Sequence, residues 1–222
     1  MKRIILSTLF GFSVTHIFLA DVGKTMHVKV GYSKITNIRD SVDAPIMIQK
    51  GYLESFNGHR IFGLGFGLKY NFPKYFFVGV NADLENTDNK YTLGSLDNNK
   101  CLKFSSKNSI NLIPIIGVSI DKFNIYVGAG ISYNQINYSQ FSEMETNPTG
   151  ALFNDYKVHN WRGNFAWCAG IDTNINSNAS LGIEYKKTRI KFSFIEYPNS
   201  DRLESHFKAD NHTVSVTFKY KF

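Results

Sequence analysis

The sequence predicts an all-β fold: a closed eight-stranded antiparallel up-and-down transmembrane β-barrel. Three observations carry this prediction. Large apolar residues alternate with smaller or polar ones in eight segments, and the side chains of a strand point alternately to opposite faces. The second face is rich in glycine, serine and asparagine and poor in charge. Short and long connections alternate between the segments.

The composition excludes several other classes of protein. Of 222 residues, 43% are hydrophobic, 15% aromatic and only 19% charged, a mixture too apolar for a disordered chain. The two cysteines exclude a disulfide-dense scaffold. The formal net charge of +7 comes from basic residues that are scattered rather than gathered in a stripe, so we expect no nucleic acid as a partner.

Residues 1–20 have the pattern of a secretory signal peptide. Lys2 and Arg3 form a basic start, and an apolar run follows that ends at the small residue Ala20. This run is a little shorter than the ~20 residues of a membrane-spanning helix. We therefore expect the protein to be exported and the segment to be cleaved, which leaves 21–222 as one barrel domain.

The first half of the mature chain contains four expected strands, at 26–33, 62–72, 76–84 and 112–120. The second of them is regular, since every other residue from Phe62 to Phe72 is large and apolar with glycine or a polar residue between. The fourth is mixed, because Ile113 and Ile115 fall on the face that otherwise carries small residues. All four predict strands with one apolar face.

The second half contains the other four, at 125–133, 161–171, 180–186 and 213–222. The last is the clearest, with Val, Phe and Tyr at every other position from Val214 to Phe222 against Ser, Thr and Lys. Beyond Lys186 two phases are open: either the alternation continues, or a bulge turns Ile190 and Phe192 outward. No helical periodicity of comparable strength is present in the mature chain.

The second face decides between a soluble and a membrane barrel. A soluble sheet would carry charged residues on its solvent face, and glycine there weakens a strand and covers nothing. Small and polar residues instead suit a narrow lumen, with the apolar face turned to lipid. A sheet in hydrocarbon must also close, because each unpaired edge amide there costs several kcal/mol.

The connections predict the orientation. They are short near 71–75, 121–124 and 174–179, and long over about 35–60, 86–108, 135–160 and 192–210. Barrels of this kind place short turns in the periplasm and long loops outside the cell. Aromatic residues near the strand ends predict girdles at both membrane interfaces: Phe72, Phe76, Tyr220 and Phe222 at one, and Tyr32, Phe62, Tyr133 and Trp161 at the other.

Three motifs carry a resemblance to a known family. The stretch from Tyr126 to Ile131 is similar to the strand that the family writes Y-V-G-A-G-hydrophobic, and Pro114–Gly117 is similar to the strand before it. The chain ends Tyr220-Lys221-Phe222. Over about 26–222 the chain thus resembles the eight-stranded OmpA/OmpX-type outer-membrane barrels, which include the opacity-like surface proteins.

This resemblance implies a place in the cell outer membrane and two partners, the outer-membrane lipid and the barrel-insertion machinery. The machinery would read a C-terminal assembly signal consisting of Phe218, Tyr220 and Phe222. One residue departs from the expected pattern. Pro114 removes a hydrogen bond from the ladder of a closed barrel, so we expect a bulge or a rim position there.

The polar face also carries ions, which we expect to form a polar network in the lumen. They are Lys29, Lys69, Asp83, Asp172, Glu184, Lys219 and Lys221. An unpaired charge in such a confined space is costly, so these groups should pair, Asp172 with Lys219 or Lys221 near the periplasmic end. Eight strands enclose a lumen that side chains just fill, which favours a plug over a gated ion path.

Lys187, Arg189 and Lys191 would face lipid if the strand continued in phase. A cation at the bilayer midplane costs roughly 2–4 kcal/mol, so these residues belong at the outer rim, where they can contact lipid phosphates. The alternative is the bulge after Lys186.

Motifs for catalysis are weak. Gly23-Lys24-Thr25 lacks the first glycine of a phosphate-binding loop, and no Cys, His or acidic cluster has metal-ligand spacing, so we expect neither a cofactor nor a metal. A hydrolase site could be drawn from Asp201, Glu204, Ser205, His206 and His212, but a solvated loop is the better interpretation. A Cys101–Cys168 disulfide is left open.

The long loops are therefore the expected site of function, because recognition usually resides in loops on a rigid scaffold. The leading hypothesis is a non-enzymatic surface antigen or adhesin, as in the opacity-like relatives, whose loops contact a host or cell-surface ligand. The alternative is a small porin-like channel for ions or solutes. The third hypothesis is an outer-membrane hydrolase that modifies lipids.

Overall fold

The protein is described here by a computed structural model that covers residues 22–42, 52–73, 75–95, 100–142, 156–196 and 203–222. The expected signal peptide and the connections at 43–51, 96–99, 143–155 and 197–202 lie outside the described residues. No helix in the described part of the chain is long and apolar enough to cross a bilayer.

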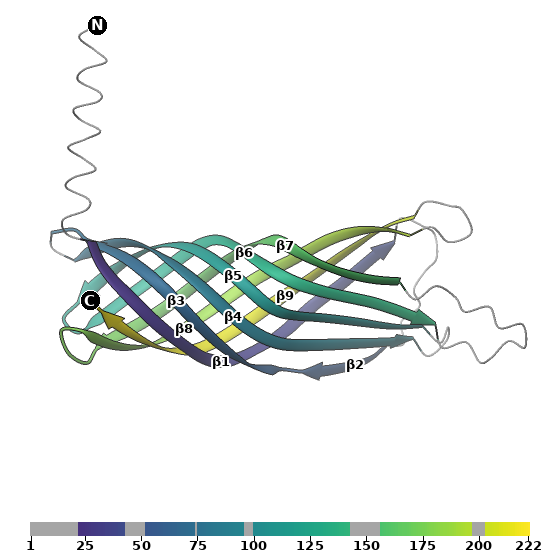
Figure 1. The fold of residues 1–222 in the computed structure, drawn as a ribbon, viewed down its shortest axis with the longest axis horizontal. Helices are drawn as coiled ribbons and strands as arrows, with labels where there is room; N and C mark the ends of the chain where they lie inside the picture. Colours follow the sequence, from purple (N-terminus) through teal and green to yellow (C-terminus); the bar gives the residue numbers. More distant parts are fainter. Residues whose placement is uncertain (1–21, 43–51, 74, 96–99, 143–155, 197–202) are drawn as a thin grey trace, which may run out of the picture.

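Long antiparallel strands form a closed barrel (Figure 1). They are β1 (Val22–Val42), β2 (Tyr52–Asn57), β3 (His59–Asn71), β4 (Phe76–Ser95), β5 (Lys100–Ile120), β6 (Phe123–Ser142), β7 (Tyr156–Asn174), β8 (Ala179–Glu196) and β9 (Leu203–Lys221). Both β2 and β3 pair with β4 and are separated only by Gly58, so they form one strand of the wall. The sheet closes through β1 with β9, which confirms the predicted eight-stranded barrel.

The strands run well beyond the predicted limits. The segments 35–60, 86–108, 135–160 and 192–210 were expected to be long loops, and much of each is strand instead. The polar residues there lack the apolar alternation that marks a membrane strand, so the sequence pattern could not reveal them. Register shifts accompany this extension, for example between Asn86 and Asn89.

The outer face of the barrel is apolar. Phe66, Val80, Trp167 and Phe218 are 39%, 37%, 39% and 46% exposed, as the membrane orientation requires. Inward-facing residues such as Lys29 are buried. The pattern is the inverse of a soluble barrel and confirms the expected direction of the two faces.

The apolar surface ends at a ring of outward-facing polar side chains, which we call the polar belt. It consists of the first such residue above the apolar ones on seven wall strands: Lys34, Arg60, Asn86, Asn108, Gln135, Lys187 and His212. Some of its members are linked directly. The Nδ2 of Asn86 donates to the Oδ1 of Asn108 at 2.7 Å, and the Nδ2 of Asn108 donates to the Oε1 of Gln135 at 2.6 Å.

Two local expectations are settled by the register. β8 pairs with β9 without a shift from Ala179 to Glu196, and Ile190 is fully buried, so no bulge follows Lys186. Pro114 was expected at a bulge or a rim, and this was wrong. It faces outward within β5 with no register shift beside it, and Gly128 on β6 lets the two strands approach, since a Cβ there would lie 2.6 Å from the Pro114 carbonyl oxygen.

Above the polar belt the wall is no longer continuous. The β7–β8 ladder ends at the pair Phe165 and Arg189, although both strands continue. The β1–β3 ladder likewise ends at Ser33 and His59, and β2 pairs only with β4 among the described strands. The upper wall therefore consists of two sheets, one of β2, β4, β5, β6 and β7, the other of β8, β9 and β1.

Candidate functional site in the barrel lumen

Five side chains meet in the middle of the lumen and form what we call the lumen ion network: His27, Lys29, Asp83, Tyr126 and Glu184. The ammonium of Lys29 lies 2.9 Å from the Oδ2 of Asp83 and 2.7 Å from the Oε1 of Glu184. The Tyr126 hydroxyl donates to the other oxygen of Glu184 at 2.9 Å, and His27 contacts Asp83.

These groups come from β1, β4, β6 and β8, so the network crosses the lumen rather than following one wall. Lys29, Asp83 and Glu184 are 1%, 2% and 3% exposed. Buried charges of this kind persist only when they are paired and hydrogen-bonded. The phase of the strands placed the three ions inward, but it gave no sign of His27 or Tyr126 as their partners.

A second ion pair lies beside the network. Lys186 on β8 contacts Glu85 on β4, and both side chains are buried. The Ser109 hydroxyl donates to the same carboxylate at 3.4 Å. Neither ion was singled out from the sequence, although both lie in phase with Glu184 and Asp83.

An apolar cluster adjoins the lumen ion network, and Tyr126 belongs to both. It contains Phe77, Ile113, Ile115, Tyr126, Ala166 and Cys168. This explains why Ile113 and Ile115 interrupt the polar face of their strand. Cys168 is a free thiol, so the disulfide that the sequence left open is not formed.

Glycine makes room for the network. A Cβ on Gly65 would lie 2.2 Å from the Nε2 of His27 and 2.3 Å from the Oδ1 of Asp83. On the far wall, a Cβ on Gly170 would lie 2.5 Å from the Tyr126 hydroxyl. The small-residue face therefore accommodates side chains that cross the lumen.

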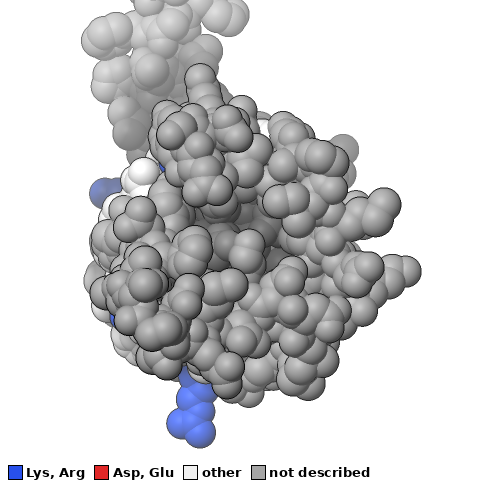
Figure 2. All heavy atoms as spheres, turned by 90° about the vertical axis from the view of Figure 1, so that its right-hand side faces the viewer, with Lys and Arg blue, Asp and Glu red and all other residues white. Residues whose placement is uncertain are grey.

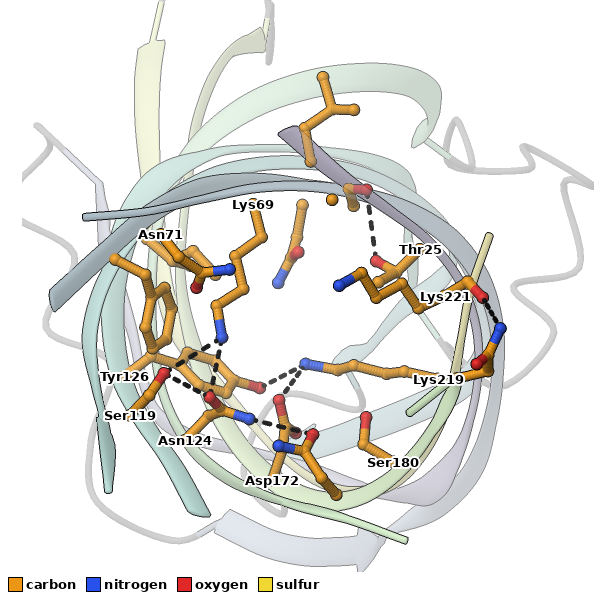
Figure 3. Close-up of a pocket in the computed structure, with 18 of the residues that line it drawn as sticks. Thr25, Lys69, Asn71, Ser119, Asn124, Tyr126, Asp172, Ser180, Lys219 and Lys221 are labelled. Carbon is orange, nitrogen blue, oxygen red and sulfur yellow. Dashed lines mark hydrogen bonds and ion pairs between the residues drawn. The ribbon is translucent and has the colours of Figure 1, made fainter. Parts of the chain in front are cut away.

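The end of the lumen at the short turns, which we expect to be the periplasmic end, holds a pocket of about 390 Å³, which we call the vestibule (Figure 3). Lys219 lies 2.6 Å from the Oδ2 of Asp172. Lys69 donates instead to the Oδ1 of Asn124 at 2.8 Å. Lys221 also lines the vestibule, and Tyr126 lies at its inner end beside the ion network.

The remaining predicted residues lie on the outer surface. Phe218, Tyr220 and Phe222 are exposed at the periplasmic end, where the Phe222 ring lies 6.2 Å from that of Phe66. Lys187, Arg189 and Lys191 face outward at and above the polar belt. The assembly signal and the contacts with lipid phosphates stay predictions.

The residues of the hydrolase alternative do not come together in the described chain. His206 accepts or donates a hydrogen bond with Ser193 at 2.7 Å, and His212 with the Tyr185 hydroxyl at 2.6 Å. Asp201 lies outside the described residues, as do the side chains of Glu204 and Ser205. In the part that the structure describes, no group of three His, Cys, Asp or Glu could hold a metal ion.

A closed antiparallel barrel with an apolar outer belt and a filled polar lumen defines a transmembrane barrel of the bacterial outer membrane. The chain matches the family model for the outer membrane protein beta-barrel domain over residues 8–222, and it belongs to that family. Membership places the protein in the outer membrane.

Solved structures show the same fold. The outer membrane protein OprG from Pseudomonas aeruginosa aligns with a TM-score of 0.56 at 15% identity, over 90% of this chain and 96% of that one. Neisserial surface protein A aligns with a TM-score of 0.50 at 12% identity, over 90% and 97%. No curated protein matches the chain.

Proposed function

We propose that this barrel is a non-enzymatic surface protein whose extracellular half recognises a host or neighbouring cell surface, and that its lumen does not conduct. The observation that carries the proposal is the lumen ion network. Lys29 lies between Asp83 and Glu184 in the middle of the barrel, and all three side chains are almost completely buried. A small barrel filled in this way works as a rigid support rather than as a pore.

The strand extensions also support this proposal. β4 continues nine residues beyond Asn86 of the polar belt, to Ser95, and pairs with β5 over most of that length. At ~3.3 Å per residue this is roughly 30 Å of strand above the apolar surface. Such hairpins present the connecting segments to the surroundings on a stiff base, where recognition usually resides.

Adhesion of bacteria that display the chain tests the recognition half of the proposal. Replacing residues 143–155 by a Gly-Ser segment of equal length should reduce binding to an epithelial monolayer or to neighbouring cells at least several-fold. The matched control replaces Ser177 and Asn178 of the periplasmic turn, which cannot reach another cell. Equal adhesion by parent and 143–155 variant contradicts surface recognition through this connection.

The second candidate function is a small channel, and the vestibule favours it. Its 390 Å³ would hold hydrated ions, and Lys69, Lys219 and Lys221 give it an excess of positive charge over Asp172. Passage from the vestibule would require the network above it to open.

Single-channel recording separates the two candidates. The refolded full chain in a planar bilayer should show no steady openings. The Glu184→Ala variant lacks one carboxylate of the lumen ion network and should open more often. Steady openings of the parent that are lost in Asp83→Ala or Glu184→Ala would establish the channel and reject the plug.

A further inference from the structure

A pocket of about 550 Å³ lies on the outer surface where β7 and β8 separate. Its lining consists of Trp161, Arg162, Gly163, Lys191, Ser193, His206 and Lys208. The separation is held open in a defined way, because the backbone N–H of Lys191 donates to the Oδ1 of Asn164 at 2.9 Å instead of joining a strand ladder. We call this the seam pocket.

The seam pocket carries uncompensated positive charge. Arg162, Lys191 and Lys208 line it together with His206, and no acidic residue is among the described residues of the lining. Lys191 and Lys208 are direct partners across the β8–β9 ladder, and like charges in that position repel each other. Within the described chain, none of the three cations forms an ion pair.

A carboxylate that the structure describes on this surface, that of Asp210, already has cationic partners. The Oδ2 of Asp210 lies 2.9 Å from the Nζ of Lys187, and its Oδ1 lies 3.4 Å from the Nε of Arg189. Lower on β8 the cations therefore have a protein partner, whereas Lys191 and Lys208 have no acidic partner among the residues that the structure describes. Basic side chains also project from the margin of the extracellular end in Figure 2. The described lining thus offers cations and no anion, which suits an external anionic ligand.

The height of the seam pocket above the membrane limits which kinds of ligand can reach it. Lys191 is four residues beyond Lys187 of the polar belt, which is roughly 13 Å along a strand. With a strand tilt of about 35–45°, this corresponds to roughly 10 Å above the apolar surface. At that level the protein faces lipid head groups and saccharides rather than hydrocarbon.

Trp161 adds a flat apolar surface to this charged pocket. Its side chain is 43% exposed, so its indole is accessible to a ligand. The apolar face of a sugar ring can pack on an indole, while a phosphate is bound well by a guanidinium and by paired ammonium groups. The hydrogen-bonded Ser193 and His206 provide polar atoms for sugar hydroxyls.

We propose that the seam pocket binds a phosphorylated sugar, with the phosphate between Lys191, Lys208 and Arg162 and the ring against Trp161. Two sources carry this chemistry: the head group of a phosphorylated glycolipid in the outer leaflet, and a saccharide phosphate from outside the membrane. Both present an anionic group attached directly to a ring, which is what the lining fits.

Fluorescence of Trp161 tests the proposal directly. The chain has two tryptophans, so the full-length Trp167→Phe variant in phosphatidylcholine nanodiscs reports on Trp161 alone. N-acetylglucosamine 1-phosphate, whose phosphate is attached to a ring carbon, should change its emission saturably, and the uncharged N-acetylglucosamine should not. The double variant Lys191→Gln/Lys208→Gln should bind at least tenfold more weakly. An unchanged titration in that variant, or no saturable response in the parent, overturns the proposal.

A matched control has the same net charge as the double variant but leaves the seam pocket unchanged. Lys107→Gln/Lys122→Gln removes the same two charges from exposed positions outside the pocket and should titrate like the parent. Heat-dependent migration on a gel verifies that each variant is folded. Adding lipid A to the nanodiscs then separates the sources: competition with N-acetylglucosamine 1-phosphate assigns the pocket to the membrane lipid, and unchanged binding assigns it to a ligand from outside.

Discussion

At the residue scale, the lumen ion network explains which parts of the site could be predicted. Alternation along each strand identifies Lys29 and Glu184 as inward-facing, because that property depends only on phase. Their contact joins residues 155 positions apart and depends on the register of every strand between them. No local pattern contains that information, so the partners Tyr126 and His27 could not be derived.

The central cation of the network should be important for stability. Lys29→Met leaves the carboxylates of Asp83 and Glu184 buried side by side without their cation, and breaking a buried ion pair costs about 3–5 kcal/mol. We expect the free energy of unfolding to fall by that amount in urea titrations of vesicle-inserted protein.

The exposed Lys122→Met is the matched control and should stay within about 0.5 kcal/mol of the parent. Adding Asp83→Asn and Glu184→Gln to Lys29→Met removes the unpaired charges and should restore part of the loss. A Lys29→Met protein as stable as the control shows that the network does not hold the barrel together.

At the element scale, glycine and proline determine how closely neighbouring strands approach. Gly130 on β6 faces β5 just beside Pro114, and a Cβ there would lie 2.2 Å from the carbonyl oxygen of Leu112. Because this atom belongs to the backbone, it cannot move aside as a flexible side chain would. The sequence predicted a lumen-packing role for such glycines, but it did not predict contacts between backbones.

Gly130→Ala should therefore destabilise the barrel by about 1–3 kcal/mol, the usual range for forcing extra volume into a packed site. Gly23→Ala is the matched control, since its nearest neighbour would be the Lys221 side chain at an ordinary 3.4 Å. Thermal unfolding followed by gel migration measures both. Equal loss in the two variants would mean that glycine content, not the approach of β5 and β6, is what matters.

Strand length is where the prediction from sequence was least complete. The membrane-spanning parts were found because lipid and lumen impose opposite polarity on successive residues. Above the polar belt, water surrounds the wall, so that constraint ends and the alternation disappears. Ser95 and Lys100, for example, belong to paired strands that were expected to be loop.

At the scale of the whole molecule, the barrel is closed within the membrane and divided into two sheets above it. Closure through β1 and β9 was predicted correctly, since hydrocarbon leaves no alternative for an edge strand. The division was not predicted, because it depends on where ladders end rather than on which residues face inward. It creates the seam pocket.

Amide hydrogen exchange can verify this division. The N–H of Lys191 points toward β7, so by alternation those of Ser193 and Ile195 also point into the gap, while those of Phe192 and Phe194 point to β9. The amides of Ser193 and Ile195 should exchange at least about 100-fold faster in nanodiscs than those of Phe192 and Phe194.

The amides near Ile183 provide the internal reference for this measurement, because β8 is paired on both sides there. All amides in this part of β8 should exchange slowly, whether their N–H groups point to β7 or to β9. Uniform protection along the whole of β8 is incompatible with a wall that divides above Arg189.

The divided upper wall also determines where the chain tolerates changes in length. One residue inserted into β7 below Phe165 would turn every later side chain from lipid to lumen, and its partners on β8 would lose their register. An insertion above Phe165 meets no ladder on that side, so β8 stays in place. Homologous chains should therefore accumulate insertions and deletions above that boundary, while the segments below it keep a constant residue count.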